Sequence, residues 1–237
     1  GVTATTAELN IMDGVTATAA EINLIDGGTA RGTTAIADAD GVLVNDAGTM
    51  RMTTMATLAT YMGTKITGGS LVFTASTGAL SGAASVQFRA QDGHFDATKF
   101  DHYIFKFMYV IPVNDNVAMQ GFVSTDNGSS YDTTNGNYHY AGNTDTDGYF
   151  ITPSYYVGSD TNEYGMCGDF TLFGPHLTNY TYAWTNGFLQ DTAGSIRYQE
   201  QGLIHLVAAD VDAIKFQFSS GNIESGEIVM YGIANGS

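Results

Sequence analysis

Charged residues, cysteine and proline are all scarce in this sequence, and long apolar runs are missing. Only 14% of the residues are charged, compared with roughly 25% in typical soluble domains. The single cysteine, Cys167, excludes an intrachain disulfide. No apolar run approaches the roughly 18 residues of a membrane span, and no signal-peptide pattern opens the chain. The sequence therefore predicts neither a disulfide-stabilised scaffold nor membrane insertion.

Basic residues are the scarcest charged type. Eight Lys and Arg stand against 24 Asp and Glu, which gives a formal net charge of −16. Residues 85–237 hold five basic and 17 acidic side chains, a net charge of −12 for that segment alone. A field of this sign repels phosphate backbones and anionic lipid surfaces. We therefore expect no nucleic-acid partner.

Glycine and aromatic residues are abundant and follow a pattern with a period of two. The chain has 29 Gly, 14 Tyr and 13 Phe but only 3 Pro. From Leu71 onward, about ten short apolar or alternating runs are separated by Gly, Asn, Asp and Ser clusters. The pattern predicts a mainly β fold, with an antiparallel, jelly-roll-like β-sandwich over residues 85–237. Residues 67–84 are predicted to form a linker and the first strand.

The first 26 residues are a tandem repeat. Residues 1–13 and 14–26 are identical at nine of thirteen positions. Both copies contain Thr-x-x-Glu, at Thr5–Glu8 and Thr18–Glu21, which is the capping box that begins a helix. An Asp-Gly stop follows each time, so each copy predicts a two-turn helix that is too short to be stable alone in water. Because the chain opens inside a repeat, we expect it to be part of a longer protein.

The apolar side chains of the repeat need partners outside their own helix. A unit that cannot cover its apolar side stacks on copies of itself, and two copies are fewer than the three or so of a solenoid. We therefore expect a symmetric homo-oligomer, with a stem over residues 1–66 that includes a further short helix at about 53–62. The residues expected at this interface are Leu9, Met12, Ile22, Ile25, Leu58 and Met62.

Three pieces of the chain together resemble a known class of protein. They are GVTATAAEINLIDG, GTMRMTTMATLATYM, and the strand pattern from YIFKFMYVIPVNDNVAMQGFVSTDNGSSYD to FQFSSGNIESGEIVMYGI. In this order they resemble tail-fibre and related appendage proteins of tailed bacteriophages, particularly phages of marine bacteria and cyanobacteria. The resemblance implies a homotrimeric virion component, made in the host cytoplasm, with a slender stem and a C-terminal β-sandwich. It carries over no catalytic motif.

Motifs for catalysis or metal binding are weak. Asn143, Asp145, Asp147 and Gly148 have the spacing of the first half of an EF-hand loop, but Ser154 stands where a bidentate Glu is needed. A calcium-stabilised loop remains an alternative to a solvated turn, whereas the histidines show no zinc spacing. No G-x-S-x-G motif occurs, and the paired carboxylates of a glycan hydrolase remain an untested alternative. We expect no cofactor and no enzymatic activity.

Sugar recognition needs aromatic faces with hydrogen-bonding groups at their rims. The loops between residues 124 and 164 supply both. Alternation also places Tyr180, Tyr182 and Trp184 on one strand face, for which a core stripe is the favoured interpretation and a sugar-binding surface the alternative. The residues predicted to contact a host receptor are Tyr131, Tyr138, His139, Tyr140, Asp145, Asp147, Tyr155, Tyr156, Asn162 and Trp184.

These expectations combine into a trimeric tail-fibre fragment whose β domain binds a host-surface glycan or protein. Three weak sites on one trimer strengthen attachment because tethered sites rebind at a high effective concentration. Other tail proteins are expected to bind through a segment that precedes residue 1. The alternatives are a structural connector or decoration protein of the virion and a bacterial surface adhesin.

Overall fold

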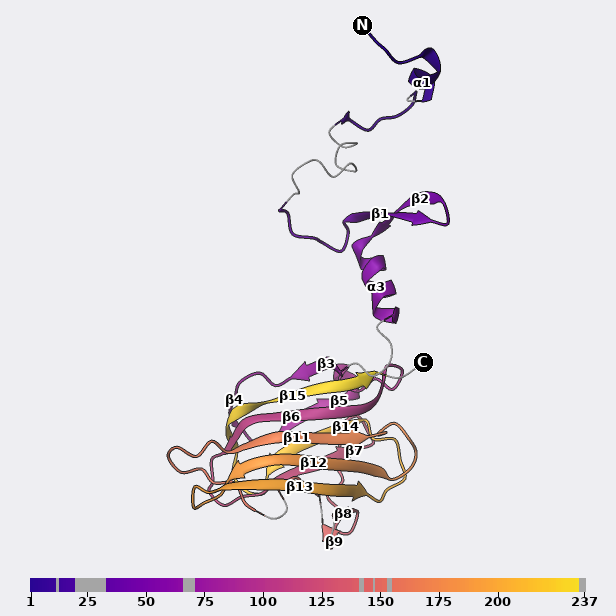
Figure 1. Ribbon diagram of the computed structural model, residues 1–237. Coiled ribbons are helices and arrows are strands. Elements are labelled where there is room, and N and C mark those ends of the chain that lie inside the picture. The colour runs from indigo at the N-terminus through magenta and orange to yellow at the C-terminus, as the bar shows by residue number, and fades with distance from the viewer. Residues whose placement is uncertain are drawn as a thin grey trace. The chain divides into compact units, whose positions relative to one another are not determined.

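The computed structural model describes residues 1–11, 13–19, 33–65, 71–140, 143–146, 148–152 and 155–234 (Figure 1). Strands account for 48% of the chain and helices for 9%, so the prediction of a mainly β fold is confirmed. The chain divides into two compact units, Gly1–Met62 and Gly63–Ser237, which we call the N-terminal and C-terminal units.

The N-terminal unit begins with the predicted capping box. The helix α1 (Thr6–Ile11) follows Thr5, whose N–H donates to the Glu8 carboxylate at 2.7 Å. The Glu8 N–H donates in return to Thr5 Oγ1 at 3.3 Å. Gly14 follows with a φ of 85°, the left-handed conformation of a helix stop. The helix of the second repeat cannot be compared, because residues 20–26 lie outside the described residues. Of the predicted interface residues, Met12, Ile22 and Ile25 also lie outside them.

A hairpin and a longer helix follow in the same unit. The strands β1 (Gly41–Asp46) and β2 (Thr49–Thr54) pair antiparallel. The helix α3 (Met55–Lys65) begins after Thr54, whose side-chain oxygen accepts the Thr57 N–H at 3.2 Å. Thr54 is therefore the N-cap. The helix begins two residues later and ends three residues later than the predicted 53–62.

No described side chain of residues 1–62 is buried in the single chain. Leu9 and Met62, both predicted at an interface between copies, are 52% and 54% exposed, and Leu58 is half-buried. Short helices and a two-stranded hairpin are marginal in water without an apolar partner. The described apolar side chains of residues 1–62 are therefore left without a cover by the other described residues of the chain.

Within its described residues, the C-terminal unit contains a nine-stranded and a four-stranded antiparallel sheet (Figure 1). The larger sheet has the order β3-β15-β6-β11-β12-β13-β8-β9, with β4 also paired to β15, and the smaller has the order β10-β7-β14-β5. The strands of the larger sheet are β3 (Leu71–Ser76), β4 (Leu80–Ala83), β6 (Phe100–Pro112), β8 (Tyr138–Tyr140), β9 (Asn143–Thr146), β11 (Met166–Phe173), β12 (Thr181–Gln190), β13 (Ile196–His205) and β15 (Ile223–Ala234). Those of the smaller sheet are β5 (Val86–Arg89), β7 (Met119–Ser124), β10 (Tyr149–Phe150) and β14 (Ala213–Phe218); a short 3-10 helix, Ala90–Asp92, follows β5.

The two sheets pack face to face through a cluster of aromatic rings. Phe216 of β14 lies at its centre and is fully buried. Its ring meets Phe105 and Phe107 of β6 edge-to-face, with centroids 5.1 and 5.2 Å apart. It also meets Phe170 of β11 at 5.6 Å and Phe88 of β5 at 6.3 Å. Edge-to-face contacts are a preferred arrangement of aromatic rings, so this cluster joins the two layers into one core.

The topology departs from the jelly-roll expectation. The strands β11, β12 and β13 follow one another as hairpins in one sheet, because their connections do not cross to the other layer. The sheets hold nine and four strands among the described residues, whereas a jelly roll has eight strands in two sheets. The segment predicted as linker and first strand contributes both β3 and β4, so the larger sheet begins before residue 85.

Candidate functional site

The first half of the strand β12 turns its large side chains outward and its small ones inward. Thr181 and Thr185 are buried, whereas Tyr182 and Trp184 are 57% and 39% exposed. The interior beside this strand is filled by Tyr149, whose hydroxyl donates to the Thr181 carbonyl at 2.9 Å. The prediction that Tyr182 and Trp184 share a face is confirmed by the alternating burial, but their interpretation as a core stripe is wrong.

Strand pairing gathers aromatic residues around Tyr182 and Trp184. Tyr182 lies opposite Phe173 of β11 and Ile204 of β13. Trp184 lies opposite Gly202, and a Cβ built on that glycine would meet nothing within 4 Å. We call Phe173, Tyr182 and Trp184 the aromatic platform. Beside it is an open hollow of about 390 Å³, lined by Phe173, Tyr182, Gly202, Ile204, His139 and Tyr140 among others.

A row of polar side chains crosses the same face next to the platform. Lys106, Asp169, Asn186 and Glu200 are direct neighbours in register on β6, β11, β12 and β13, and we call them the polar row. Lys106 Nζ donates to both Asp169 oxygens, at 2.8 and 2.9 Å. Glu200 accepts the Tyr198 hydroxyl at 3.0 Å. The Asn186 amide has no hydrogen bond within the described part of the chain, so it is available to a ligand.

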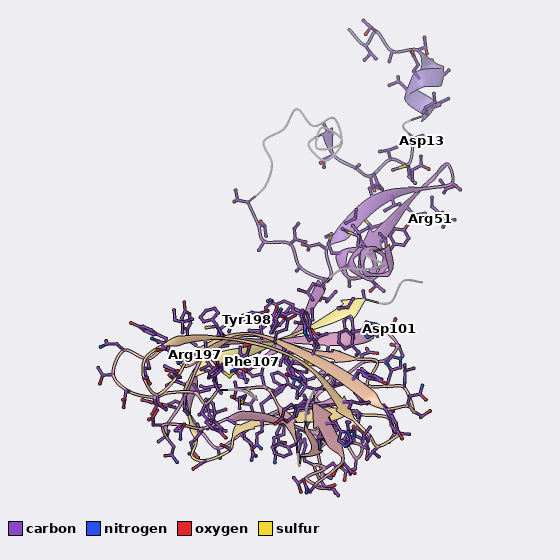
Figure 2. The ribbon with its side chains drawn as sticks, turned by 60° about the horizontal axis from the view of Figure 1, so that its bottom comes forward. Asp13, Arg51, Asp101, Phe107, Arg197 and Tyr198 are labelled. Carbon is purple, nitrogen blue, oxygen red and sulfur yellow. The ribbon has the colours of Figure 1, made fainter. Side chains whose placement is uncertain are left out.

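A second apolar group lies beyond the polar row. Phe188, Ile196 and Tyr198 are 52%, 73% and 65% exposed, and we call them the distal patch. Figure 2 labels Tyr198 of this patch and also Phe107 of β6, whose side chain is buried in the core. Monomeric proteins rarely expose continuous apolar patches larger than a few hundred Å². The platform, the polar row and the distal patch lie together on the outer face of the larger sheet, across β6, β11, β12 and β13, and have the composition of an interaction surface.

Two of the predicted loop residues lie away from the outer face. Tyr138 is fully buried, and its hydroxyl is satisfied there: it donates to the Asp132 carbonyl at 2.9 Å and accepts the Val123 N–H at 3.1 Å. Its prediction as a receptor contact is wrong, since its ring belongs to the core. Tyr131 is half-buried, with the Lys215 ammonium 5.0 Å from the centroid of its ring.

Other predicted residues come together around the hollow. His139 and Tyr140 of β8 both line it beside Tyr182. His139 lies opposite Ile204, whereas Tyr140 lies opposite the buried Leu203 and packs against the core. Trp184, predicted from a different segment, stands in the next row of β12. The sequence predicted Tyr182 in a sugar-binding surface only as the alternative to a core stripe, and Phe173 was not predicted as a site residue. The alternation of Tyr182 with Trp184 was the signal for the first of them.

The remaining predicted residues lie in a loop or outside the described part. Tyr155 and Tyr156 are 40% and 53% exposed, and the Arg197 guanidinium lies 4.9 Å from the centroid of the Tyr155 ring. Asn162 is exposed and has a φ of 73°, which identifies it as a turn residue. The side chain of Asp145 and the whole of Asp147 lie outside the described residues.

A buried Asp–His pair lies beneath β8. His205 Nε2 is 2.8 Å from the Asp132 carboxylate, and the histidine is 1% exposed. Burial lowers the pKa of His205 and outweighs the opposite effect of Asp132. Burial also works to raise the pKa of Asp132, but hydrogen bonds from His205, Thr134 and Asn137 together lower it to about 2. At neutral pH the pair is therefore a carboxylate beside a neutral imidazole.

The hydroxyl groups near this pair do not form a nucleophile–base arrangement with it. A hollow of about 200 Å³ is lined by Ser124, Ser130 and His205 among others. Both serine hydroxyls donate to Asp126, at 2.7 and 2.6 Å, rather than to His205. Within the described residues, the pair is thus a structural contact between β13 and the loop that precedes β8.

Metal ligands are not gathered anywhere in the described ranges, where no group of three or more His, Cys, Asp or Glu is placed to hold a metal ion. The predicted calcium loop overlaps β9, and its carboxylate side chains are not among those described. No helix in the described part of the chain is both long and apolar enough to cross a membrane. Scans of protein-family models, curated proteins and solved structures returned no match to this chain.

Proposed function

We propose that this chain is part of a trimeric, non-enzymatic attachment fibre in the tail of a bacteriophage, and that its C-terminal unit binds a glycan on the host surface. The observation that carries the proposal is the inverted burial of β12, which places Tyr182 and Trp184 in solvent and threonines in the core. Exposed rings do not stabilise the fold, since it is the burial of apolar area that does so. A bound ligand that covers Tyr182 and Trp184 would bury this area instead.

The neighbouring groups fit a sugar. A pyranose ring presents apolar C–H faces that pack on aromatic rings, and its hydroxyls are both donors and acceptors. The next outward side chain of β12 after Trp184 is Asn186, and the Glu200 carboxylate lies opposite it on β13. Successive outward side chains of a strand are roughly 6.7 Å apart. One bound saccharide can therefore contact the platform and the polar row together.

The N-terminal unit supports the trimeric part of the proposal. Its described residues form a hairpin and helices without a buried side chain, and Leu9 and Met62 are more than half exposed. Stacking three copies about an axis covers these side chains without any further partner. Three linked C-terminal units then bind a surface polymer with an avidity that exceeds the affinity of each site.

A structural connector is the second candidate, because of the distal patch. Phe188, Ile196 and Tyr198 add exposed apolar area beyond what one saccharide covers. In this alternative, the outer face of the larger sheet packs on another virion protein, and no host molecule is bound. The resemblance to phage appendage proteins supports both candidates equally.

Adsorption of the purified chain to host cells separates the two candidates. For an attachment fibre we expect saturable adsorption, competition with whole phage, and at least tenfold weaker adsorption for the Trp184→Ala variant. Tyr164→Ala, which removes an exposed aromatic outside the platform and outside the predicted receptor contacts, is the control and should adsorb normally. Failure of the native chain to adsorb or compete would favour the connector.

The oligomeric state is measured independently by light scattering of the same chain. We expect the mass of a trimer at micromolar concentration. The double variant Leu9→Asp with Ile22→Asp should give monomers with an unchanged β-sheet circular dichroism spectrum. A monomeric native chain would contradict the trimeric stem.

A further inference from the structure

We infer that the glycan bound by the aromatic platform is uncharged, an assignment that rests on the proposed function of the outer face. Host-surface polysaccharides fall into neutral and acidic classes, the latter carrying carboxylates, sulfates or phosphates. Proteins recognise acidic sugars chiefly with Arg and Lys, since charge-assisted hydrogen bonds to anionic oxygens are the strong ones. The positions of the cationic side chains therefore decide the class.

Every lysine and arginine described in residues 71–234 is already engaged. Four form ion pairs with N–O distances of 2.5–2.8 Å: Arg89 with Asp92, Lys99 with Asp96, Lys106 with Asp169, and Arg197 with Asp191. The fifth, Lys215, lies 5.0 Å from the ring centroids of both Phe122 and Tyr131. An anionic sugar would have to displace one of these partners before it could form a pair of its own.

The cation beside the platform is the most fully neutralised of them. Lys106 is the single basic member of the polar row, and both oxygens of Asp169 accept from its ammonium group. Glu200, at the other end of the row, contributes a further negative charge without a basic partner in the described residues. The net charge of the polar row is thus negative, and residues 85–237 carry −12 in all. An added carboxylate or sulfate is repelled both locally and by the whole unit.

The uncharged hydroxyls of a neutral sugar are not repelled by these negative charges. A sugar hydroxyl donates to the Glu200 carboxylate or exchanges hydrogen bonds with the Asn186 amide, and no charge is transferred out of water. Trp184 and Tyr182 supply the ring faces, and Gly202 leaves space beside Trp184 for the sugar. The ligand assigned to the face is therefore a neutral pyranose oligosaccharide.

An array of matched glycan pairs tests the assignment with the chain of residues 1–237. Each pair consists of one neutral oligosaccharide and the same core with a single sialic acid, uronate or sulfate added. We expect neutral members to bind and their acidic derivatives to bind at least tenfold more weakly at low ionic strength, with the gap narrowing as salt is added. Preferential binding of acidic members would overturn the assignment and leave the proposed function intact. Binding to no glycan at all would overturn both.

The variant Asp169→Asn provides a gain-of-function test at the same site. It removes the partner of Lys106 and leaves a free ammonium group one row along and two strands across from Trp184. We expect the tenfold difference in affinity between neutral glycans and their acidic derivatives to decrease to threefold or less. The control variant Asp210→Asn removes one negative charge from the exposed loop before β14 and should leave this difference in affinity unchanged. Equal behaviour of the two variants would show that the ligand does not contact the polar row.

Discussion

Truncation of Phe216 tests whether the two sheets of the C-terminal unit share one core. The Phe216 side chain is fully buried, and its ring packs against four other phenylalanines drawn from both layers. The variant Phe216→Ala removes the ring at the centre of this cluster. Neither β-sheet hydrogen bonds nor charges are altered, so any loss of stability reports the packing between the layers.

The expected loss is large because the site has little freedom to collapse. Phe→Ala changes in cores cost about 3–5 kcal/mol, and edge-to-face ring pairs contribute about 0.5–1.5 kcal/mol each beyond area burial. Four such contacts place Phe216→Ala at the upper end, about 4–5 kcal/mol. In a unit of this size, each kcal/mol lowers the Tm by roughly 2–4 °C, so a decrease of roughly 8–20 °C is expected.

Urea and thermal unfolding followed by circular dichroism measure this difference. Phe188→Ala is the matched control, because it makes the same chemical change on the outer face, where the ring is 52% exposed. We expect it to cost less than half as much as Phe216→Ala. Equal losses for the two variants would refute the face-to-face packing of the sheets.

Three further predictions concern the buried pair, the hollow and the stem. The folded chain holds the pKa of His205 below its ordinary 6.5, so the unfolded chain binds a proton more readily there. The free energy of unfolding should therefore decrease as the pH falls from 6.5 toward the lowered pKa. In urea denaturation at a series of pH values, His205→Gln should make this decrease smaller. The free energy of unfolding should decrease a second time below pH 4, because Asp132 has a pKa of about 2 in the folded chain and is protonated more readily in the unfolded chain. Gly202→Val, whose side chain would fill the hollow, should leave the Tm within a few degrees and weaken glycan binding about tenfold on the array. Thr5→Ala should destabilise α1 by about 1 kcal/mol, seen as earlier thermal dissociation of the oligomer, and Thr3→Ala outside the capping box should not.

Local patterns predicted local structure well. The capping box of Thr5 and Glu8 joins residues three apart, so its hydrogen bonds depend on nothing beyond that segment. The N-cap at Thr54 is of the same kind. Both were predictable because the atoms that satisfy them are specified within one turn of helix.

The side of β12 that is buried was not predictable in this way. Alternation shows that Tyr182 and Trp184 share a face, but it does not show which face the other sheet covers. That outcome depends on the rings brought from distant segments, such as Tyr149, which take up the space beside Thr181. The usual rule that large apolar residues lie inside then gives the wrong answer for the site itself.

The polar row shows why the candidate site could not be read from any single segment. Its four members come from four strands, and they become neighbours only through the registers of three strand pairs. Tyr138 shows the opposite error, since its loop-rich surroundings suggested exposure and the fold buries it completely. A residue's neighbours along the chain therefore indicate little about its neighbours across a sheet.

The negative charge and the aromatic face would have complementary effects in the proposed attachment fibre. An open face with Trp184, Phe188 and Tyr198 favours association between units, which would hide the site. A charge of −12 on residues 85–237 opposes that association over the Debye length, about 8 Å at physiological salt. The same field has little effect on an uncharged oligosaccharide. Acidic residues distributed over the unit therefore keep the outer face accessible without reducing its affinity for a neutral ligand, and this selectivity would be lost if the ligand itself were anionic.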